Sequence, residues 1–227
     1  MTSSVLRAIV VADGAPPTRA ALDAAWPGWD AGTDLVIAAD GGARLADALG
    51  LPIHRWVGDG DSLGEAGLAA LRRRGVPIEL ASPDKDASDT ELGLLAAIGA
   101  GAGRVAIIGA LGGPRPDHAL ANIALLGHPA AVGRELLILD PAARIRLLDS
   151  VAGLLDLGGR VGDIVSLIPL EPVTGVTTAG LRFPLEDDTL IVGPALGISN
   201  IRAASDATVT IRSGRLLVVE APARLPR

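Results

Sequence analysis

Short runs of β-branched and aliphatic residues alternate with longer segments rich in alanine and leucine from Val5 to Asp140. The short runs have the length of buried strands, and the longer segments place apolar residues at helical spacing. This alternation predicts repeated βα units around a parallel sheet. The expected strands are Leu6–Ala12, Leu35–Ala39, Arg55–Val57, Ile78–Leu80, Val105–Ile108 and Leu136–Leu139. The expected helices are Thr18–Ala25, Ala43–Leu49, Glu65–Arg73, Asp89–Ile98 and His118–Leu126.

After Asp140 the helical spacing stops, and short strand-like runs are separated by glycine, proline and aspartate. This pattern predicts a separate, small β domain. Its expected strands are Ile164–Ile168, Leu190–Val192, Ala207–Ile211 and Leu216–Val219. We therefore expect an α/β domain over residues 1–142, with a Rossmann-like parallel sheet and helices on both faces. A sandwich-like all-β domain follows over residues 143–227, with the boundary in the segment Pro141–Val151.

Helix starts are indicated at two places by a hydroxyl residue followed three positions later by an acid. Ser62 precedes Glu65 in this way, and Ser88 precedes Glu91. In such a capping box the hydroxyl accepts a backbone N–H of the first turn, and the acid reaches back to the N-cap. We expect both serines to begin helices.

Composition narrows the classes of partner. The chain is 49% hydrophobic and its net charge is −6, so it lacks the clustered basic charge that nucleic acid or an anionic membrane requires. No apolar run approaches the roughly 20 residues of a membrane helix. The chain has no cysteine, and its first residues lack the layout of a secretory signal, so we expect a cytoplasmic protein. Small molecules are the expected ligands.

Acidic residues follow successive predicted strands at the point where each strand ends. Asp40-Gly41-Gly42 follows one strand, Gly58-Asp59-Gly60-Asp61-Ser62 the next, and Asp84-Lys85-Asp86-Ala87-Ser88-Asp89 the one after. A loop containing Arg115, Asp117 and His118 follows the strand at Val105–Ile108. Ligands of open α/β sheets bind beyond the carboxyl ends of the strands. These loops are therefore expected to meet at one edge.

Carboxylates gathered at one edge repel one another unless a cation lies among them. With oxygen ligands and no thiolate, the expected ion is Mg²⁺, held jointly by carboxylates and substrate phosphates. Gly41 and Gly42 let backbone N–H groups approach a phosphate chain, Arg115 adds a bidentate donor, and Lys85 adds a point charge.

Each acid also has a simpler interpretation. A lone aspartate such as Asp40 or Asp117 fits a helix cap or turn, and Ser88 is already explained by capping. The pair Asp59 and Asp61 is harder to explain by capping. No P-loop, dinucleotide fingerprint, nucleophile elbow or His-Glu-x-x-His helix occurs, which favours an aspartate and Mg²⁺ site for a nucleoside triphosphate.

Taken with their order and spacing, these motifs resemble the thiamine pyrophosphokinase family. The resembling stretches are Asp-Gly-Gly-Ala at 40–43, Gly-Asp-x-Asp-Ser at 58–62, Asp-Lys-Asp-x-Ser-Asp at 84–89, and the arginine loop through Asp117 and His118 with the following Asn122. Further resemblance lies at Thr178–Leu185 and at Gly-Ile-Ser-Asn, residues 197–200. The resemblance thus covers nearly the whole chain.

The resemblance implies an enzyme that converts thiamine and ATP to thiamine diphosphate and AMP, working as a homodimer with active sites shared between subunits. By the same resemblance Asp59, Asp61 and Asp89 would hold Mg²⁺, and Arg115 and Asp117 would contact the reacting groups. The remaining candidates for binding ATP or thiamine are Asp40, Gly41, Gly42, Lys85, Asp86, Ser88, Asn122, Ser199 and Asn200.

In the implied reaction the thiamine hydroxyl attacks the β-phosphorus while AMP leaves, so catalysis consists mainly of alignment and charge neutralisation. Asp117 is the candidate for accepting the hydroxyl proton. Two alternatives stay open from the residues: a pyrophosphokinase acting on another alcohol, such as a hydroxymethylpterin, and a noncatalytic nucleotide-binding homologue.

Overall fold

The computed structural model describes residues 5–82, 84 and 86–224, and the chain forms two compact units. The first unit ends at Asp140 and the second begins at Pro141. Within the described residues, no helix has the length and hydrophobicity needed to cross a membrane.

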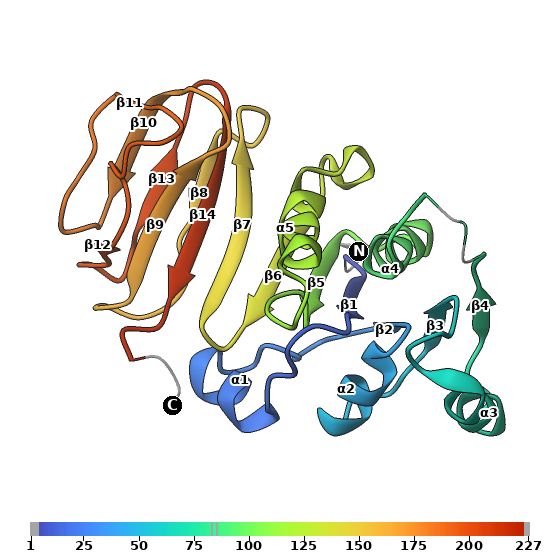
Figure 1. The fold of residues 1–227 in the computed structure, drawn as a ribbon. Helices are drawn as coiled ribbons and strands as arrows, with labels where there is room; N and C mark the ends of the chain where they lie inside the picture. Colours follow the sequence, from blue (N-terminus) through green and yellow to red (C-terminus); the bar gives the residue numbers. More distant parts are fainter. Residues whose placement is uncertain (1–4, 83, 85, 225–227) are drawn as a thin grey trace. The chain divides into compact units, whose positions relative to one another are not determined.

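The first unit alternates strands and helices, as the sequence predicts (Figure 1). Its strands are β1 (Arg7–Val11), β2 (Leu35–Ala39), β3 (Arg55–Gly58), β4 (Ile78–Leu80), β5 (Arg104–Ile108) and β6 (Glu135–Asp140). Its helices are α1 (Arg19–Ala25), α2 (Gly42–Ala48), α3 (Gly64–Arg73), α4 (Asp89–Gly99) and α5 (Pro116–Ala124), followed by the 3₁₀ turns η1 (Leu125–Gly127) and η2 (Pro129–Ala131). The predicted elements of this unit are confirmed.

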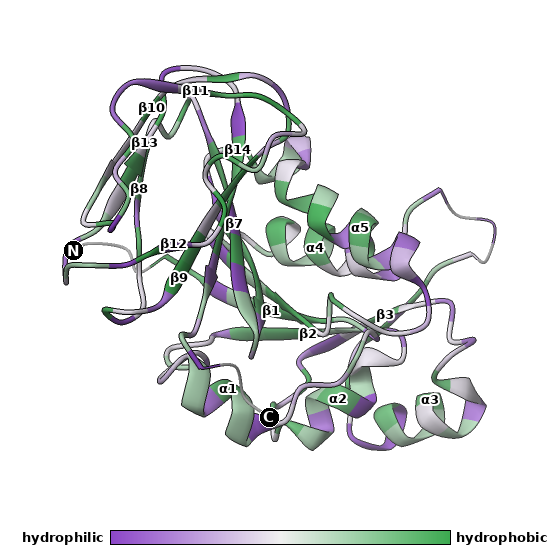
Figure 2. Ribbon diagram, turned by 60° about the vertical axis from the view of Figure 1, so that its left-hand side comes forward, coloured by the Kyte–Doolittle hydropathy of each residue, from purple (hydrophilic) through white to green (hydrophobic). Residues whose placement is uncertain are grey.

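These strands are parallel and lie in the order β6-β5-β1-β2-β3-β4. Helices α1, α2 and α3 cover one face of the sheet, and α4 and α5 cover the other, in both Figure 1 and Figure 2. The chain builds outward from β1 through β4, then returns to add β5 and β6 on the other side. The order therefore reverses between β1 and β5, which is where open α/β sheets form ligand crevices.

Covering both faces explains why the central strands read as continuous apolar runs. Val10, Val11 and Ile37 are fully buried. Figure 2 accordingly shows β1 and β2 as largely hydrophobic strands. Trp56 in β3 is also fully buried, and its indole N–H donates to the carbonyl of Asp40 at 2.9 Å. The core of this unit thus reaches directly beneath the loop that carries Asp40.

The two predicted capping serines have different outcomes. Ser88 is the N-cap of α4, and its hydroxyl accepts the N–H of Glu91 at 3.2 Å, which confirms the prediction. For Ser62 the prediction is wrong, because α3 has Leu63 as its N-cap and no side-chain cap. The Ser62 hydroxyl instead donates to Asp61, and the Asp40 carboxylate accepts the backbone N–H groups of Ser62 and Leu63. Asp40, from the loop after β2, thus accepts the N–H groups that a local cap would otherwise accept.

The second unit consists of antiparallel sheets around their own core. One sheet has the order β12-β9-β14-β7 and the other β11-β10-β13-β8. Its strands are β7 (Ala143–Asp149), β8 (Leu154–Asp156), β9 (Ile164–Pro169), β10 (Val173–Ala179), β11 (Asp188–Leu190), β12 (Asn200–Ile201), β13 (Thr208–Thr210) and β14 (Arg215–Ala221). Leu167, Val176 and Val218, from both sheets, are buried together in that core, which is the expected sandwich-like arrangement.

Strands β7, β8, β10 and β12 lie outside the sequence expectation. In β10 the cause is Gly175, whose φ of 68° coincides with a shift of register against β11 and breaks the alternating pattern. In β7, Arg144 and Arg146 interrupt the apolar run, so the sequence pattern did not predict a strand there.

Candidate functional site

The loops after β1 and β5, together with those after β2, β3 and β4, line a pocket of about 340 Å³ at the carboxyl edge of the parallel sheet. The pocket is therefore at the reversal of strand order. Its lining residues are Asp13, Gly14, Ala39, Asp40, Ser62, Ser88, Asp89, Thr90, Ala110, Gly112, Gly113, Pro114, Arg115, His118 and Asn122. This volume is of the size that small-molecule sites commonly have.

Asp40 is held in an uncommon backbone conformation at the end of β2. Its φ is 43°, in the left-handed region that non-glycine residues rarely adopt. Its N–H donates to the Val57 carbonyl at 2.8 Å, and its own carbonyl accepts the Trp56 indole. Its carboxylate is occupied by the N–H groups of Ser62 and Leu63. These contacts over-determine the conformation, and such enforced strain is typical of functional positions.

Asp59 lies in the loop between β3 and α3, where the backbone passes very close to Asp40. A Cβ on Gly58 would come within 2.9 Å of the Asp40 Cβ, so this position requires glycine. The Asp59 carboxylate accepts the N–H of Asp61 at 3.1 Å, an interaction within the loop. The glycine therefore allows the two acidic loops to approach one another.

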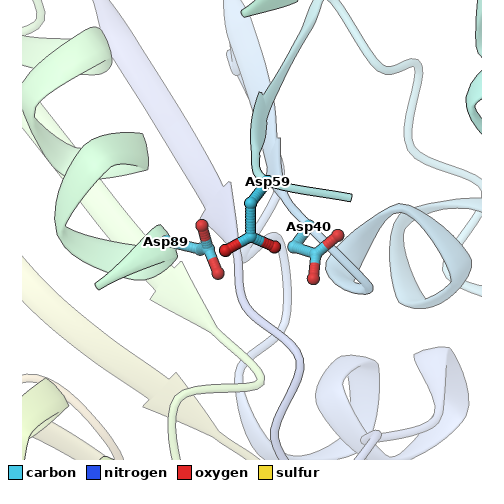
Figure 3. A group of neighbouring side chains, drawn as sticks. All are labelled: Asp40, Asp59 and Asp89. Atoms are coloured by element: carbon cyan, nitrogen blue, oxygen red, sulfur yellow. The ribbon is translucent and has the colours of Figure 1, made fainter. Parts of the chain in front are cut away.

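Asp89 is the first residue of α4, next to the capping Ser88. One carboxylate oxygen from each of Asp40, Asp59 and Asp89 lies within 4.8 Å of the others, and Figure 3 shows the three side chains side by side, with Asp59 between Asp89 and Asp40. They come from the loops after β2, β3 and β4. Three carboxylates from three separate loops at this separation form a candidate cation site.

Asp61 is not in this group of described acidic residues. Its side chain is exposed and accepts the Ser62 hydroxyl at 3.1 Å. Asp61 nevertheless acts on the site electrostatically: burial is the main cause that raises the pKa of Asp40, and a hydrogen bond with Asp61 raises it further. The geometry thus pairs Asp40, rather than Asp61, with Asp59 and Asp89.

The electrostatics of the pocket edge favour a bound cation. Burial raises the pKa of the Asp40 carboxyl, while the hydrogen bonds from Ser62 and Leu63 oppose this rise. A pKa raised by burial and by a second carboxylate reflects the cost of keeping these groups charged together. A divalent ion would remove that cost. Ligand oxygens at about 2.1 Å from Mg²⁺ lie about 3.0 Å apart when adjacent and about 4.2 Å apart when opposite, so the three carboxylates would have to move closer together to share one ion.

Asp13 is a pocket residue that the sequence reasoning missed. It follows β1, lines the pocket, and lies 3.9 Å from Arg44. Burial raises the pKa of Asp13, Arg44 lowers it and Asp61 raises it. Asp13 comes two residues after the end of β1. Its position therefore carries the same sequence signal as the other candidates, an acidic residue directly after a strand.

Arg115 and Asp117 form a closed pair at the start of α5. Arg115 Nε donates to Asp117 Oδ1 at 2.9 Å, and Nη2 donates to Oδ2 at 2.5 Å. The Arg115 guanidinium lowers the pKa of Asp117 to about 2 and has its own pKa raised in return. Both side chains are exposed, so the pair is accessible to a ligand.

Asn122 and the glycines of the first loops hold the pocket walls. Asn122 is buried and donates to the Ala110 carbonyl at 2.8 Å, which ties α5 to the loop after β5. A Cβ on Gly42 would meet the Val11 carbonyl oxygen at 2.0 Å, and one on Gly41 would meet the Asp13 carboxylate at 2.1 Å. Backbone contact at these points leaves no room for a side chain.

The remaining candidates are placed as follows. Asp86 is exposed in the loop before α4, and Lys85 lies outside the described residues. Ser88 lines the pocket, although its hydroxyl also caps α4. In the second unit, Ser199 has a φ of 60° and donates its N–H to Ser166. Asn200 is buried, and its amide accepts the N–H of Phe183 and donates to the Phe183 carbonyl, so it fixes that loop.

Comparisons of the sequence with protein families and with known proteins all identify thiamin pyrophosphokinases as similar. Residues 29–138 match the family described as thiamin pyrophosphokinase, catalytic domain, and residues 155–217 match thiamin pyrophosphokinase, vitamin B1 binding domain. The chain is 27% identical over 196 residues to thiamine pyrophosphokinase of Bacillus subtilis (strain 168), and the match covers 86% of each chain.

Solved structures agree with the sequence comparison. The crystal structure of thiamine pyrophosphokinase from Bacillus subtilis matches with a TM-score of 0.80 at 25% identity, over 95% of this chain and 99% of that one. The crystal structure of yeast thiamin pyrophosphokinase matches with a TM-score of 0.74 at 15% identity, over 97% of this chain and 87% of that one, which shows a shared fold.

Proposed function

The chain belongs to the thiamin pyrophosphokinase family, and on that basis we propose that it transfers the diphosphoryl group of ATP to the hydroxyl of thiamine, giving thiamine diphosphate and AMP. The observation that carries the proposal is the approach of Asp40, Asp59 and Asp89 to within 4.8 Å of one another beside a pocket of small-molecule size. Phosphoryl transfer depends mainly on alignment and charge neutralisation, and this arrangement suits both.

In this proposal Asp59 and Asp89 hold Mg²⁺ together with Asp40. Asp61, the further ligand expected from the family resemblance, would need to turn from Ser62 to join them. Bound Mg²⁺ would neutralise the phosphate oxygens and help to align the β-phosphorus. The chain's own contribution is to fix the loops, and the hydrogen bonds to Asp40 join the loops after β2 and β3 before any ligand arrives.

Arg115 and Asp117 are proposed to act together on the reacting groups. The thiamine oxygen forms a bond to the β-phosphorus, the bond from that phosphorus to the oxygen retained by AMP breaks, and the hydroxyl proton must be accepted. While Arg115 is paired with Asp117, the pKa of that carboxyl stays near 2, which makes it a weak base. Asp117 can accept the proton late in the step once Arg115 has turned to the phosphate.

The acceptor, the assembly and the location are further parts of the proposal. Family membership supports thiamine as acceptor. On the resemblance of residues 197–200 to that family, we propose that Ser199 and Asn200 line its pocket. The same resemblance supports a homodimer with shared active sites, and the absence of cysteine fits a cytoplasmic location. The acidic net charge supports small molecules, rather than nucleic acid or membranes, as partners.

The test measures AMP and thiamine diphosphate after incubation with ATP, Mg²⁺ and an acceptor. We expect equal amounts of both products with thiamine and none with a hydroxymethylpterin. AMP formation with the pterin but not with thiamine would contradict the proposal and indicate a pyrophosphokinase that acts on the pterin. AMP formation with neither acceptor would indicate a noncatalytic nucleotide-binding protein. Asp59→Ala should lower kcat/KM by about 100-fold or more. The control is Asp47→Ala, which removes a carboxylate of α2 that pairs with Arg74 at the end of α3. It should change kcat/KM little.

A further inference from the structure

Arg44, in the first turn of α2, touches two of the loops that surround the acidic site. Its Nη1 donates to the Ser62 carbonyl at 2.9 Å, in the loop after β3. Its Nη2 lies 3.9 Å from Asp13 Oδ2, in the loop after β1. One guanidinium therefore joins the loops that follow β1 and β3 from a helix that follows β2.

The Ser62 peptide is the outer anchor of the loop that carries Asp59. The Asp40 carboxylate accepts the N–H of Ser62 at 3.1 Å, and Arg44 donates to its carbonyl. Within the loop, the Asp59 carboxylate accepts the N–H of Asp61 at 3.1 Å. Asp59 and Ser62 thus lie in one short loop, and the contacts that hold Ser62 restrain the segment that carries Asp59.

Asp13 is placed to orient the guanidinium that holds Ser62. Its carboxylate lies directly over Gly41, where even a Cβ would collide with it. An arginine has a planar fork of donors, so a carboxylate on one side and a carbonyl on the other define its orientation. Exposed ion pairs of this kind add little stability by themselves. The consequence of the contact is therefore geometric.

We propose that Arg44, oriented by Asp13, is a positioning residue that sets the Asp59–Ser62 loop for cation binding. This inference rests on the proposed function, since it concerns the same cation site. Neither residue needs to touch the cation or the substrate. Arg44 acts through the Ser62 carbonyl, and Asp13 acts through Arg44.

The experiment compares Arg44→Gln, Arg44→Lys and Asp13→Asn with the unaltered protein. Binding of Mn²⁺ alone, as a spectroscopic substitute for Mg²⁺, is measured by electron paramagnetic resonance, and the Mg²⁺ dependence of thiamine diphosphate formation is measured separately. We expect Arg44→Gln to weaken Mn²⁺ binding about fivefold, by loss of one charge-assisted hydrogen bond. The Mg²⁺ concentration for half-maximal rate should rise similarly, with kcat at saturating Mg²⁺ changed less than about twofold.

Controls separate positioning from other roles. Arg44→Lys keeps the charge but not the fork, so its Mn²⁺ affinity should fall between those of Arg44→Gln and the unaltered protein. Asp13→Asn should weaken Mn²⁺ binding as well, and adding it to Arg44→Gln should have little further effect, because the two act in one chain of contacts. Arg74→Gln breaks a comparable bridge to Asp47 and should leave Mn²⁺ binding unchanged.

The inference is overturned if Arg44→Gln binds Mn²⁺ normally, or if it raises only the KM for ATP, which would indicate direct phosphate contact. Additive effects of Arg44→Gln and Asp13→Asn would also contradict it. Failure of the unaltered protein to form thiamine diphosphate would instead refute the proposed function. The Mn²⁺ comparison would still decide the role of Arg44 in that case.

Discussion

At the residue scale, Asp40 illustrates how one side chain can serve both the fold and the site. Its carboxylate accepts two backbone N–H groups from the next loop, and one of its oxygens also lies within 4.8 Å of oxygens of Asp59 and Asp89. The capping interpretation and the ligand interpretation of a lone aspartate after a strand are therefore compatible here. Its left-handed backbone is stabilised by Val57 and Trp56 on the neighbouring strand.

A prediction at this scale concerns the acid titration of Asp117. Because the Arg115 guanidinium lowers its pKa from 3.8 to about 2, the carboxylate should stay charged at pH 3. The interaction is fully present above pH 3.8 and is lost as the pH falls through about 2. Carboxyl ¹³C resonances followed by NMR should give this midpoint. In Arg115→Gln it should move up toward 3.8, and a midpoint near 3.8 in the unaltered protein would contradict the pairing.

At the scale of elements, helix starts at the carboxyl edge are controlled by different contacts. Helix α4 begins with a local cap from Ser88, which leaves Asp89 in its first turn facing the site. Helix α3 begins where the distant Asp40 accepts the N–H groups of Ser62 and Leu63. The site is therefore built at helix starts by one local and one long-range interaction.

This difference predicts unequal effects of two similar substitutions. Ser88→Ala removes the hydroxyl that accepts the Glu91 N–H and should destabilise the protein by about 1 kcal/mol. Ser62→Ala removes only an exposed bond to Asp61 and should change stability by less than about 0.5 kcal/mol. Urea unfolding of the two variants provides the comparison. Equal losses would restore Ser62 as a cap.

At the scale of the whole molecule, the two units have separate hydrophobic cores. The core of the first unit includes Leu22 and Trp56, and that of the second includes Leu148 and Val218. The second unit also contains a buried ionic cluster, in which Glu220 accepts from Arg144 at 2.7 Å and from Arg146 at 2.6 Å. Glu220 lies on β14 and both arginines lie on β7, so the cluster fixes the pairing of these strands.

Glu220→Gln should therefore destabilise one unit selectively. It leaves two partly buried guanidiniums without their shared carboxylate, a change that commonly costs about 3–5 kcal/mol. Hydrogen exchange should show lost protection in β7, β9 and β14, with β1, β2 and β3 unchanged. Glu171→Gln, which breaks the exposed pair with Arg215, is the matched control and should alter neither. Uniform loss over both units would contradict separate cores.

Much of the first unit was predictable because its signals are local. Buried parallel strands are continuous apolar runs in the sequence. The start of α4 is indicated by Ser88 and Glu91, three positions apart. The second unit was predicted less completely, because Gly175 in β10 and the arginines of β7 interrupt the pattern. Those arginines are accommodated by Glu220, a residue 74 or more positions away that no local window includes.

By itself, the sequence determined which loops carry carboxylates and glycines, since strand ends and turn residues are encoded by neighbours along the chain. Only the tertiary structure decided which of those carboxylates meet. It brought Asp40 to Asp59 and Asp89, added Asp13 and Arg44 beside them, and left Asp61 facing Ser62. The reason is physical: these distances depend on strand order, on the close approach at Gly58 and on hydrogen bonds spanning 22 or more residues.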